Sequence, residues 1–397
     1  MNPYLRKLFR FNWVLLALMI ALCVCSIVAI YCATFMRDPH SYLSQSPRKQ
    51  TIWIAVSMVV FFGVGLTDYK WIKWGALPVY IGGVGLLVLC KFIGKAHFGA
   101  KSWLEFGSFS LQPSQLAILG GIMIIGLLLS EYRRMHPMLK ILLCGVIAGP
   151  PCLLVAIQPQ LGGVIVWMPV IMMMLFVGGI PLRYLIAMIL IGSAVLPVAT
   201  NFLKPFQRAR IMTFLDPDAD PLGAGWNVNQ SLTAIGSGGF HGKGFKARDT
   251  LVEQNLLPPT VAHTDFIFSV IGEAFGFVGG ATLLCLFACT LVTGLYVAYQ
   301  AKDQLGLLLA VGVMTLFFTH VFMNSSMTIS LMPIAGLPLP IISYGGTFVM
   351  IIMFSLGIVQ SVWIHRKNIV PPRAVNLSEP AKNAVAARVV TRAVPAR

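Results

Sequence analysis

Two acidic side chains, one at the start of an apolar stretch and one inside it, are candidates for chemistry. Asp265 follows His263 and Thr264 and directly precedes the apolar run from Phe266, and Glu273 lies deep inside that run. A carboxylate beside a low-dielectric region has its charged form disfavoured, so its pKa rises toward that of a useful general base. Asp is also a preferred helix N-cap, and this structural role fits the position of Asp265 as well.

Glu273 is eight residues after Asp265. On a continuous helix this spacing corresponds to about 12 Å of rise and roughly 80° of rotation, so the two carboxylates would not share one site unless the segment breaks. A break or close helix contact is plausible because glycines crowd the segment, at Gly272, Gly276, Gly279 and Gly280. A carboxylate inside a membrane span indicates a function by default, and an internal structural hydrogen bond is the alternative.

A glycine-rich stretch runs from Gly236 to Gly244 and reads GSGGFHGKG. It lacks the Walker spacing, because the position five before Gly242 is Ser237 and Lys243 is followed by Gly244. A nucleotide site is therefore not expected. Glycine-rich backbone beside a lysine can still hold a phosphate through N–H groups and one point charge, and a tight turn at the membrane surface is the alternative.

The composition identifies the class of protein that must position these groups. Of 397 residues, 57% are hydrophobic and 11% are charged, and the mean hydropathy is +0.82. A soluble domain carries about 25% charged residues, so this chain could not maintain a water-facing surface. The eight cysteines form no CxxC pair and the seven histidines show no metal-site spacing, so the cysteines are expected to be buried hydrophobes and a dedicated metal site is not expected.

The apolar runs predict an all-α, polytopic membrane protein, because a span needs roughly 20 apolar residues. The first run is too long for a signal peptide and is expected to remain in the protein. No internal repeat is evident. The eighth run is too long for one straight crossing. The ten expected spans cover residues 12–34, 51–67, 72–93, 114–131, 138–157, 162–180, 183–202, 266–298, 305–330 and 344–364.

The basic residues set the expected orientation. The chain has 29 Lys and Arg against 13 Asp and Glu, in short clusters between apolar runs, which favours membrane orientation over nucleic-acid binding. The positive-inside rule favours cytoplasmic termini, because 17 of the 29 Lys and Arg then lie inside. The loop 203–265 between spans seven and eight is then extracytoplasmic. Cations expected on that face are Lys101, Arg208, Arg210, Lys243, Lys246 and Arg248.

Two further segments have distinct compositions. The loop 203–265 mixes glycine with apolar residues, so it is expected to pack on the membrane face of the bundle rather than act as a linker. The tail, residues 368–397, is basic and rich in Ala, Val and Pro, and is expected to be disordered, cytoplasmic and near anionic lipid. The protein is thus divided into a membrane domain, 1–367, and a tail.

Four motifs stand in order along the chain. They are QPS from Gln112 to Ser114, the stretch RARIMTFLDPDADPLGAGWNVNQSLTAIGSGGFHGKG from Arg208 to Gly244, HTDFIF from His263 to Phe268, and LPLPIISYGG from Leu337 to Gly346. Together they resemble the SEDS family, the peptidoglycan glycosyltransferases of the RodA, FtsW and SpoVE type. The resemblance covers residues from about 10 to 367 and is closest to the RodA type.

The resemblance implies the reaction and its partners. It implies an inverting transfer that polymerises lipid II, an undecaprenyl-pyrophosphate disaccharide-pentapeptide, during cell elongation and cell-shape maintenance at the bacterial inner membrane. Asp265 matches the catalytic position and is expected to be the general base. The expected partners are a class B penicillin-binding protein transpeptidase, other membrane proteins of the elongation complex and the lipid bilayer, with no nucleic acid. No cofactor is certain, and a divalent cation, Mg or Mn, is left open.

The resemblance also assigns candidate roles to residues around the base. Substrate-binding candidates are Lys101, Gln112, Ser114, Arg208, Arg210, Gln230, Ser231, Lys243, His263, Thr264, Ser343 and Tyr344. Residues with a structural or uncertain role are Glu273, Asn324, Gly345 and Gly346.

This sequence departs from the family pattern at several polar positions. Where the family usually carries an acid it has Gln115, Gln160, Pro259 and Ala274, and where the family carries a lysine and an arginine it has Ile118 and Ser102. These departures favour a less active or differently tuned member. The alternatives are a lipid II flippase, an FtsW-type division polymerase and a catalytically weak scaffold.

Overall fold

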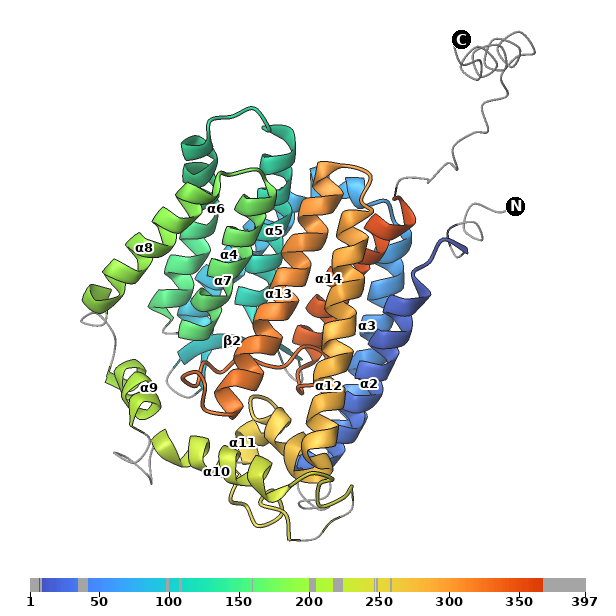
Figure 1. The fold of residues 1–397 in the computed structure, drawn as a ribbon, viewed down its shortest axis with the longest axis vertical. Coiled ribbons are helices and arrows are strands. Elements are labelled where there is room, and N and C mark those ends of the chain that lie inside the picture. The colour runs from blue at the N-terminus through green and yellow to red at the C-terminus, as the bar shows by residue number, and fades with distance from the viewer. Residues whose placement is uncertain are drawn as a thin grey trace, which may run out of the picture. The chain divides into compact units, whose positions relative to one another are not determined.

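The apolar runs of the sequence form long helices in the computed structural model (Figure 1). The structure describes residues 7, 9–34, 42–97, 100–106, 109–158, 160–199, 205–216, 224–245, 247, 249–257 and 259–366. Each of the ten expected spans contains a helix. These helices are α2 (Trp13–Thr34), α3 (Ser46–Leu66), α4 (Ile72–Ile93), α5 (Pro113–Glu131), α6 (Pro137–Ile157), α7 (Leu161–Val177), α8 (Leu182–Ala199), α12 (Ile267–Tyr299), α13 (Gln304–Thr328) and α14 (Gly346–Ile364).

Among the described residues, eight helices are long and apolar enough to cross a membrane. The helices α7 and α8 have shorter apolar stretches, Gly162–Val177 and Leu182–Val195. The protein is therefore a multi-pass membrane protein, and the count of ten crossings stays a prediction. The predicted boundary at residue 367 and the tail lie outside the described residues.

Shorter elements connect the long helices. A small antiparallel sheet of β1 (Lys95–His97), β2 (Ala100–Phe106) and β3 (Phe109–Leu111) joins α4 to α5, and Leu104 pairs with Leu111 across β2 and β3. The segment between α8 and α12 contains α9 (Pro205–Leu215), α10 (Ala224–Ser237) and α11 (Pro259–Ala262). Two 3-10 turns, η1 (Tyr42–Gln45) and η2 (Tyr69–Trp71), precede α3 and α4.

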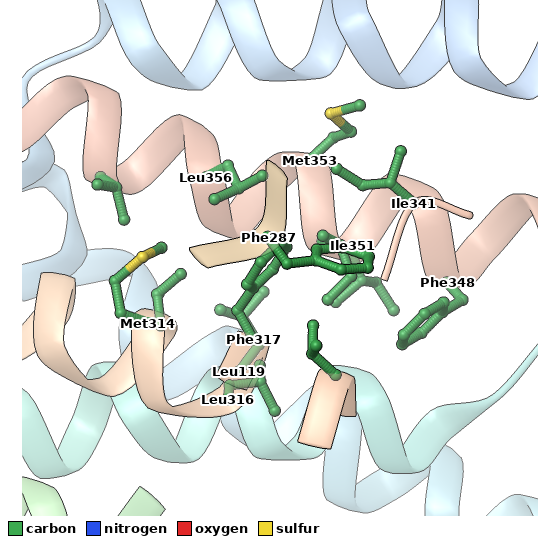
Figure 2. Close-up of a cluster of buried hydrophobic side chains, with 14 of the residues drawn as sticks. Leu119, Phe287, Met314, Leu316, Phe317, Ile341, Phe348, Ile351, Met353 and Leu356 are labelled. Atoms are coloured by element: carbon green, nitrogen blue, oxygen red, sulfur yellow. The ribbon is translucent and has the colours of Figure 1, made fainter. Parts of the chain in front are cut away.

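The most buried helices, α13 and α14, form the centre of the bundle. Helix α13 contacts α5, α7, α12 and α14, and α14 packs along α3. Figure 2 shows apolar side chains from α5, α12, α13 and α14 meeting in this core, among them Phe287, Phe317 and Phe348. Leu337, Leu339, Ile341 and Ile342 of the segment between α13 and α14 belong to the same core, so this part of the segment packs against the helices.

The long helix α12 breaks at Gly276, as the glycine-rich sequence suggested. Gly276 has φ 64° and ψ −159°, a backbone conformation that is essentially restricted to glycine. At this point the glycine-rich stretch packs directly on the helix through four backbone hydrogen bonds of 2.9–3.1 Å. The N–H groups of Lys243 and Gly244 donate to the carbonyls of Glu273 and Ala274, and those of Phe277 and Val278 donate to the carbonyls of Gly239 and Phe240. The stretch is thus a backbone packing element.

We predict that Gly276→Ala destabilises the protein. A Cβ at this position would lie 2.3 Å from the backbone nitrogen of Gly242, and the backbone strain alone costs about 1–3 kcal/mol. Gly145→Ala is the matched control, because nothing lies within 4 Å of its Cβ position and it is inside α6. Thermal unfolding in detergent measures both. A melting temperature of Gly276→Ala equal to that of the wild type would contradict this account.

Candidate active site

Asp265 lies in the turn between α11 and α12. The carbonyl oxygen of Val261 accepts the backbone N–H groups of Thr264, Asp265 and Phe266 at 3.2, 2.9 and 3.0 Å. The N-cap position of α12 is Phe266, and no side chain caps the helix there. The capping role that the sequence left open for Asp265 is therefore not realised at α12, and its carboxylate remains available for chemistry.

Buried side chains hold the backbone of this turn against the segment between α13 and α14. The side-chain amide of Asn324 donates to the carbonyl oxygens of Asp265 at 2.8 Å and Leu337 at 2.7 Å. The hydroxyl of Ser343 donates to the carbonyl of Thr264 at 2.6 Å and accepts the N–H of Leu339 at 2.7 Å. Two polar side chains thus connect the HTD and LPLPIISYGG motifs, which lie far apart in the sequence.

The aromatic pair beside Asp265 adds to this connection. The N–H of Tyr344 donates to the carbonyl of His263 at 2.9 Å, and their rings lie 5.3 Å apart. His263 and Ser343 are buried, while Thr264 and Tyr344 are partly exposed. The structure therefore brings four predicted site residues, His263, Thr264, Ser343 and Tyr344, together around Asp265.

Sequence reasoning missed a second layer of support from α2 and α3. The buried side-chain amide of Gln50 donates to Ser26 and to the carbonyl oxygens of Ile341 and Ser343, at 3.2–3.5 Å. Ser26 donates to the carbonyl of Ile342 at 3.0 Å. A polar Gln beside the apolar run of α3 was the available signal, and its target lies about 290 residues further along the chain.

Burial and a nearby cation set the electrostatics of Asp265. Burial of the carboxyl group raises the pKa of Asp265 to about 6, and the Arg210 guanidinium and the Thr264 hydrogen bond oppose this rise. Burial also lowers the pKa of Arg210, against the attraction of Asp265. Gly336 has φ 62°, and a Cβ there would lie 3.6 Å from Asp265 Oδ2. The carboxyl group therefore faces a glycine backbone on one side and lies within the field of a cation.

Arg210 lies on α9 and also contacts the segment between α13 and α14. Its Nη1 donates to the carbonyl of Ile334 at 3.4 Å. A small cavity beside it is lined by residues of α9, α10 and that segment, namely Arg210, Thr213, Phe214, Val228, Ser330, Met332, Pro333 and Ile334. Arg208 on the same helix is exposed. Sequence spacing alone does not distinguish these two arginines, but the tertiary structure does.

Other predicted site residues lie outside the immediate surroundings of Asp265. Ser231 on α10 hydrogen-bonds Ser269 on α12 and the carbonyl of Thr328, both at 2.6 Å, so it joins three helices. Gln230 is its partly exposed neighbour. Gln112 and Ser114 are buried at the start of α5, and Gln112 Oε1 and Ser114 Oγ have no hydrogen-bond partner among the described residues.

The remaining candidates are explained by backbone packing or pairing. A Cβ at Gly346 would meet the ring of Trp53 at 2.2 Å, and the N–H of Gly345 donates to Gln50 Oε1 at 3.4 Å. Lys243 pairs with Glu273 at 2.7 Å. Lys101 lies in β2, but its side chain is outside the described part of the structure. Lys246 and Arg248 lie outside the described residues altogether.

The described residues around Asp265 do not by themselves form a site for a divalent cation. Mg²⁺ and Mn²⁺ favour several oxygen ligands, usually including more than one carboxylate or a substrate phosphate. Among the described residues no three His, Cys, Asp or Glu side chains group together, and Asp265 has the cation Arg210 nearby. We therefore assign no catalytic step to a metal.

The chain matches the FtsW/RodA/SpoVE family model, described as "Cell cycle protein", over residues 7–368. The chain belongs to this family. It is 35% identical to the "Peptidoglycan glycosyltransferase MrdB" of Escherichia coli (strain K12) over 315 residues, covering 79% of this chain and 84% of that protein. It is 29% identical to the "Peptidoglycan glycosyltransferase RodA" of Treponema pallidum (strain Nichols), covering 90% and 98% of the two chains.

The fold of the family is confirmed by a solved structure. A chain from "Structural coordination of polymerization and crosslinking by a peptidoglycan synthase complex" superposes with a TM-score of 0.76 and 27% identity, covering 90% of this chain and 99% of that chain. The resemblance seen in the HTD and LPLPIISYGG motifs is thus confirmed at the level of the family. The roles of the individual residues stay predictions.

We predict that Arg210→Met raises the pKa of Asp265 above about 6, because it removes the positive charge that opposes the effect of burial. Infrared titration of the protonated carboxyl band, assigned by its loss in Asp265→Asn, measures this change. Arg208→Met is the control, because Arg208 is exposed and should leave the titration unchanged. An unaltered midpoint in Arg210→Met would show that burial alone sets the pKa.

Proposed function

We propose that this membrane protein is a peptidoglycan glycosyltransferase that polymerises lipid II into glycan strands during cell elongation and cell-shape maintenance. The names of its MrdB and RodA relatives support the reaction class. The observation that carries the proposal is the state of Asp265, whose carboxyl group has a raised pKa of about 6 on a backbone fixed by Asn324 and Ser343. Such a group is ionised at neutral pH and is still basic enough to take a proton.

The proposed step is an inverting displacement. An oxygen of the Asp265 carboxylate accepts the proton of the acceptor sugar 4-hydroxyl while that hydroxyl oxygen attacks the anomeric carbon of the donor. The bond from this carbon to the phosphate oxygen breaks, and undecaprenyl pyrophosphate leaves with the bonding electron pair. Fixed geometry matters because a hydroxyl and a base held at contact distance react without the entropy cost of an encounter.

Among the cations whose side chains the structure describes, Arg210 is the one placed to assist this displacement. Its guanidinium is half-buried, so its charge is screened less by water than the charge of exposed Arg208. A guanidinium near the reacting centre offsets the negative charge that develops on the leaving pyrophosphate. The same charge keeps the pKa of Asp265 from rising further, which preserves the carboxylate at neutral pH.

The proposed location is the bacterial inner membrane, with both termini cytoplasmic and the 203–265 segment extracytoplasmic. The distribution of Lys and Arg supports this orientation. We further propose a class B penicillin-binding protein transpeptidase as partner, alongside other membrane proteins of the elongation complex. The structural neighbour supports this choice, because it belongs to a peptidoglycan synthase complex that coordinates polymerisation with crosslinking.

We predict that Asp265→Asn lowers the rate of lipid II polymerisation by about 10²–10⁴-fold, the usual contribution of a general base. The purified variant is assayed with lipid II, alone and with its transpeptidase partner, by resolving glycan strands on gels. Asp216→Asn is the control, because Asp216 is exposed at the end of α9 and should retain activity. Strand lengths and rates like those of the wild type in Asp265→Asn would overturn the proposal.

The alternatives give different results in paired assays. A lipid II flippase moves labelled lipid across vesicles without forming polymer, and a weak scaffold shows neither activity while still binding its partner. Cells depleted of an elongation polymerase become round, whereas cells depleted of a division polymerase form filaments.

We predict that kcat/KM for polymerisation rises with pH and reaches a plateau above about pH 6. The general base must be ionised, so the rate follows the deprotonated fraction of Asp265, whose pKa lies at about 6. Below this pH the rate should fall about tenfold per unit. Arg210→Met should move the acidic limb to higher pH together with the infrared midpoint of Asp265, and a limb that stays in place while that midpoint shifts would argue against Asp265 as the titrating group.

A further inference from the structure

Glu273 is a buried acid that the proposed chemistry does not use. Its side chain is 1% exposed, and it lies two turns into α12 within an otherwise apolar stretch. An ionised carboxylate in such surroundings is costly unless charged and hydrogen-bonding partners compensate for the water it has lost. The partners of Glu273 therefore show which part of the chain its carboxylate binds.

Both partners of Glu273 come from the segment between α10 and α11. Its Oε1 accepts the ammonium of Lys243 at 2.7 Å and the backbone N–H of Leu251 at 2.6 Å. The Lys243 ammonium donates a second hydrogen bond to the carbonyl of Asp249 at 3.2 Å. One carboxylate oxygen thus fixes two points of the segment, eight residues apart, on the same turn of α12.

The backbone contacts around this pair are close. The N–H of Lys243 donates to the carbonyl of Glu273 at 3.0 Å, and the N–H of Gly244 donates to the carbonyl of Ala274 at 2.9 Å. Gly242 has φ 80°, and a Cβ there would lie 2.4 Å from the carbonyl oxygen of Ala274. The segment is therefore held on α12 by backbone hydrogen bonds as well as by the ion pair of Lys243 with the buried Glu273.

The fixed segment leads directly to the catalytic turn. Leu251 O accepts the N–H groups of Leu256 and Leu257 at 3.0 and 3.2 Å, which closes a turn with Leu251 and Leu257 buried. Helix α11 and Asp265 follow within eight residues of Leu257. Asp265 is thus flanked on one side by the segment that Glu273 holds and on the other by the helix that carries Glu273.

We infer that Glu273 and Lys243 are positioning residues, whose ion pair, formed by a buried carboxylate and a partly exposed ammonium, fixes the segment from Lys243 to Leu257 on α12 and thereby sets the place of Asp265. This inference rests on the proposed function. It assigns Lys243 a role different from substrate binding, because its ammonium is occupied by Glu273 and by the carbonyl of Asp249. A positioning pair affects the rate of the chemical step, whereas a substrate contact affects the binding of lipid II.

The first test compares kcat and KM for lipid II in Lys243→Met and Glu273→Gln. Each variant should lower kcat by on the order of tenfold and leave KM within about twofold, because displacement of a reacting group slows the chemical step. Glu273→Gln should be the milder change, since its amide oxygen can still accept the N–H of Leu251. A raised KM with unchanged kcat in Lys243→Met would overturn the inference.

The matched control is an exposed ion pair of the same chemistry. Lys73 and Glu131 pair at 3.4 Å with both side chains 53% exposed. Such pairs contribute little to stability or geometry. Lys73→Met and Glu131→Gln should leave both kinetic constants unchanged.

The second test replaces the ion pair by a covalent bond. In a background with the exposed Cys285 and Cys289 changed to Ala, Lys243→Cys and Glu273→Cys are combined, since a backbone hydrogen bond already joins these two residues. The reduced double variant should show the low kcat, and oxidation to the disulfide with oxidised glutathione should restore kcat to within about twofold. A confirmed disulfide without recovery of kcat would contradict the positioning role.

Hydrogen exchange separates this inference from the proposed function. If the wild type makes no polymer, the proposed function fails, and the kinetic tests do not apply. Exchange at the amide of Leu251 and across 249–257 then decides the inference, because protection in the wild type should fall in Lys243→Met, fall less in Glu273→Gln, whose amide oxygen can still accept the N–H of Leu251, and be retained in Glu131→Gln. Equal protection in wild type and both variants would show that the pair does not fix the segment.

Discussion

Buried backbone groups without helical partners must be bonded by side chains, and this constraint organises the structure around Asp265. In the segment between α13 and α14, Leu337, Leu339, Ile341, Ile342 and Ser343 are buried, and an unpaired carbonyl in such surroundings costs about 1–3 kcal/mol. Asn324, Ser343, Gln50 and Ser26 supply the bonds that its irregular backbone lacks. Asn324 and Ser343 also bond the turn that carries Asp265, so the support of one segment fixes the other.

The same constraint explains the break in α12. The non-helical backbone of Gly276 interrupts the regular hydrogen bonds of the helix, and the N–H groups of Phe277 and Val278 donate to carbonyls of the glycine-rich stretch instead. Glu273 adds a charged contact at the same level, paired with Lys243. The two halves of the long segment before α12 thus have different roles. The part near α9 contributes Arg210 to the site, while the part after α10 is seated on the helix as a support.

The chain belongs to the FtsW/RodA/SpoVE family, and the structure shows where several residues that depart from the expected family pattern lie. Gln115 and Gln160 place neutral amides where the pattern has acids, with Gln115 buried in α5 and Gln160 preceding α7. The carbonyl of Ala274 accepts the N–H of Gly244, so this position contributes through its backbone. Asp265 is the carboxylate whose environment fits a base, and the proposed reaction depends on it alone among the described acids.

The sequence by itself determined the class of protein and the helices, and it supplied the prediction that Asp265 is the reactive group. Ten apolar runs predict ten helices because the hydropathy of a span is a local property, and the resemblance of the HTD motif to the family predicts Asp265 as the general base. The glycines indicated the break in α12 without fixing which residue adopts it.

The tertiary structure alone decided which polar residues meet. It distinguished Arg210 from Arg208, brought Gln50 to Ser343, and paired Lys243 with Glu273 rather than leaving it free for a phosphate. It also placed the α12 N-cap at Phe266 and so left the carboxylate of Asp265 uncommitted to that helix. Such pairings depend on how distant helices pack, and hydrogen bonds between residues up to 316 positions apart leave no signal in local spacing.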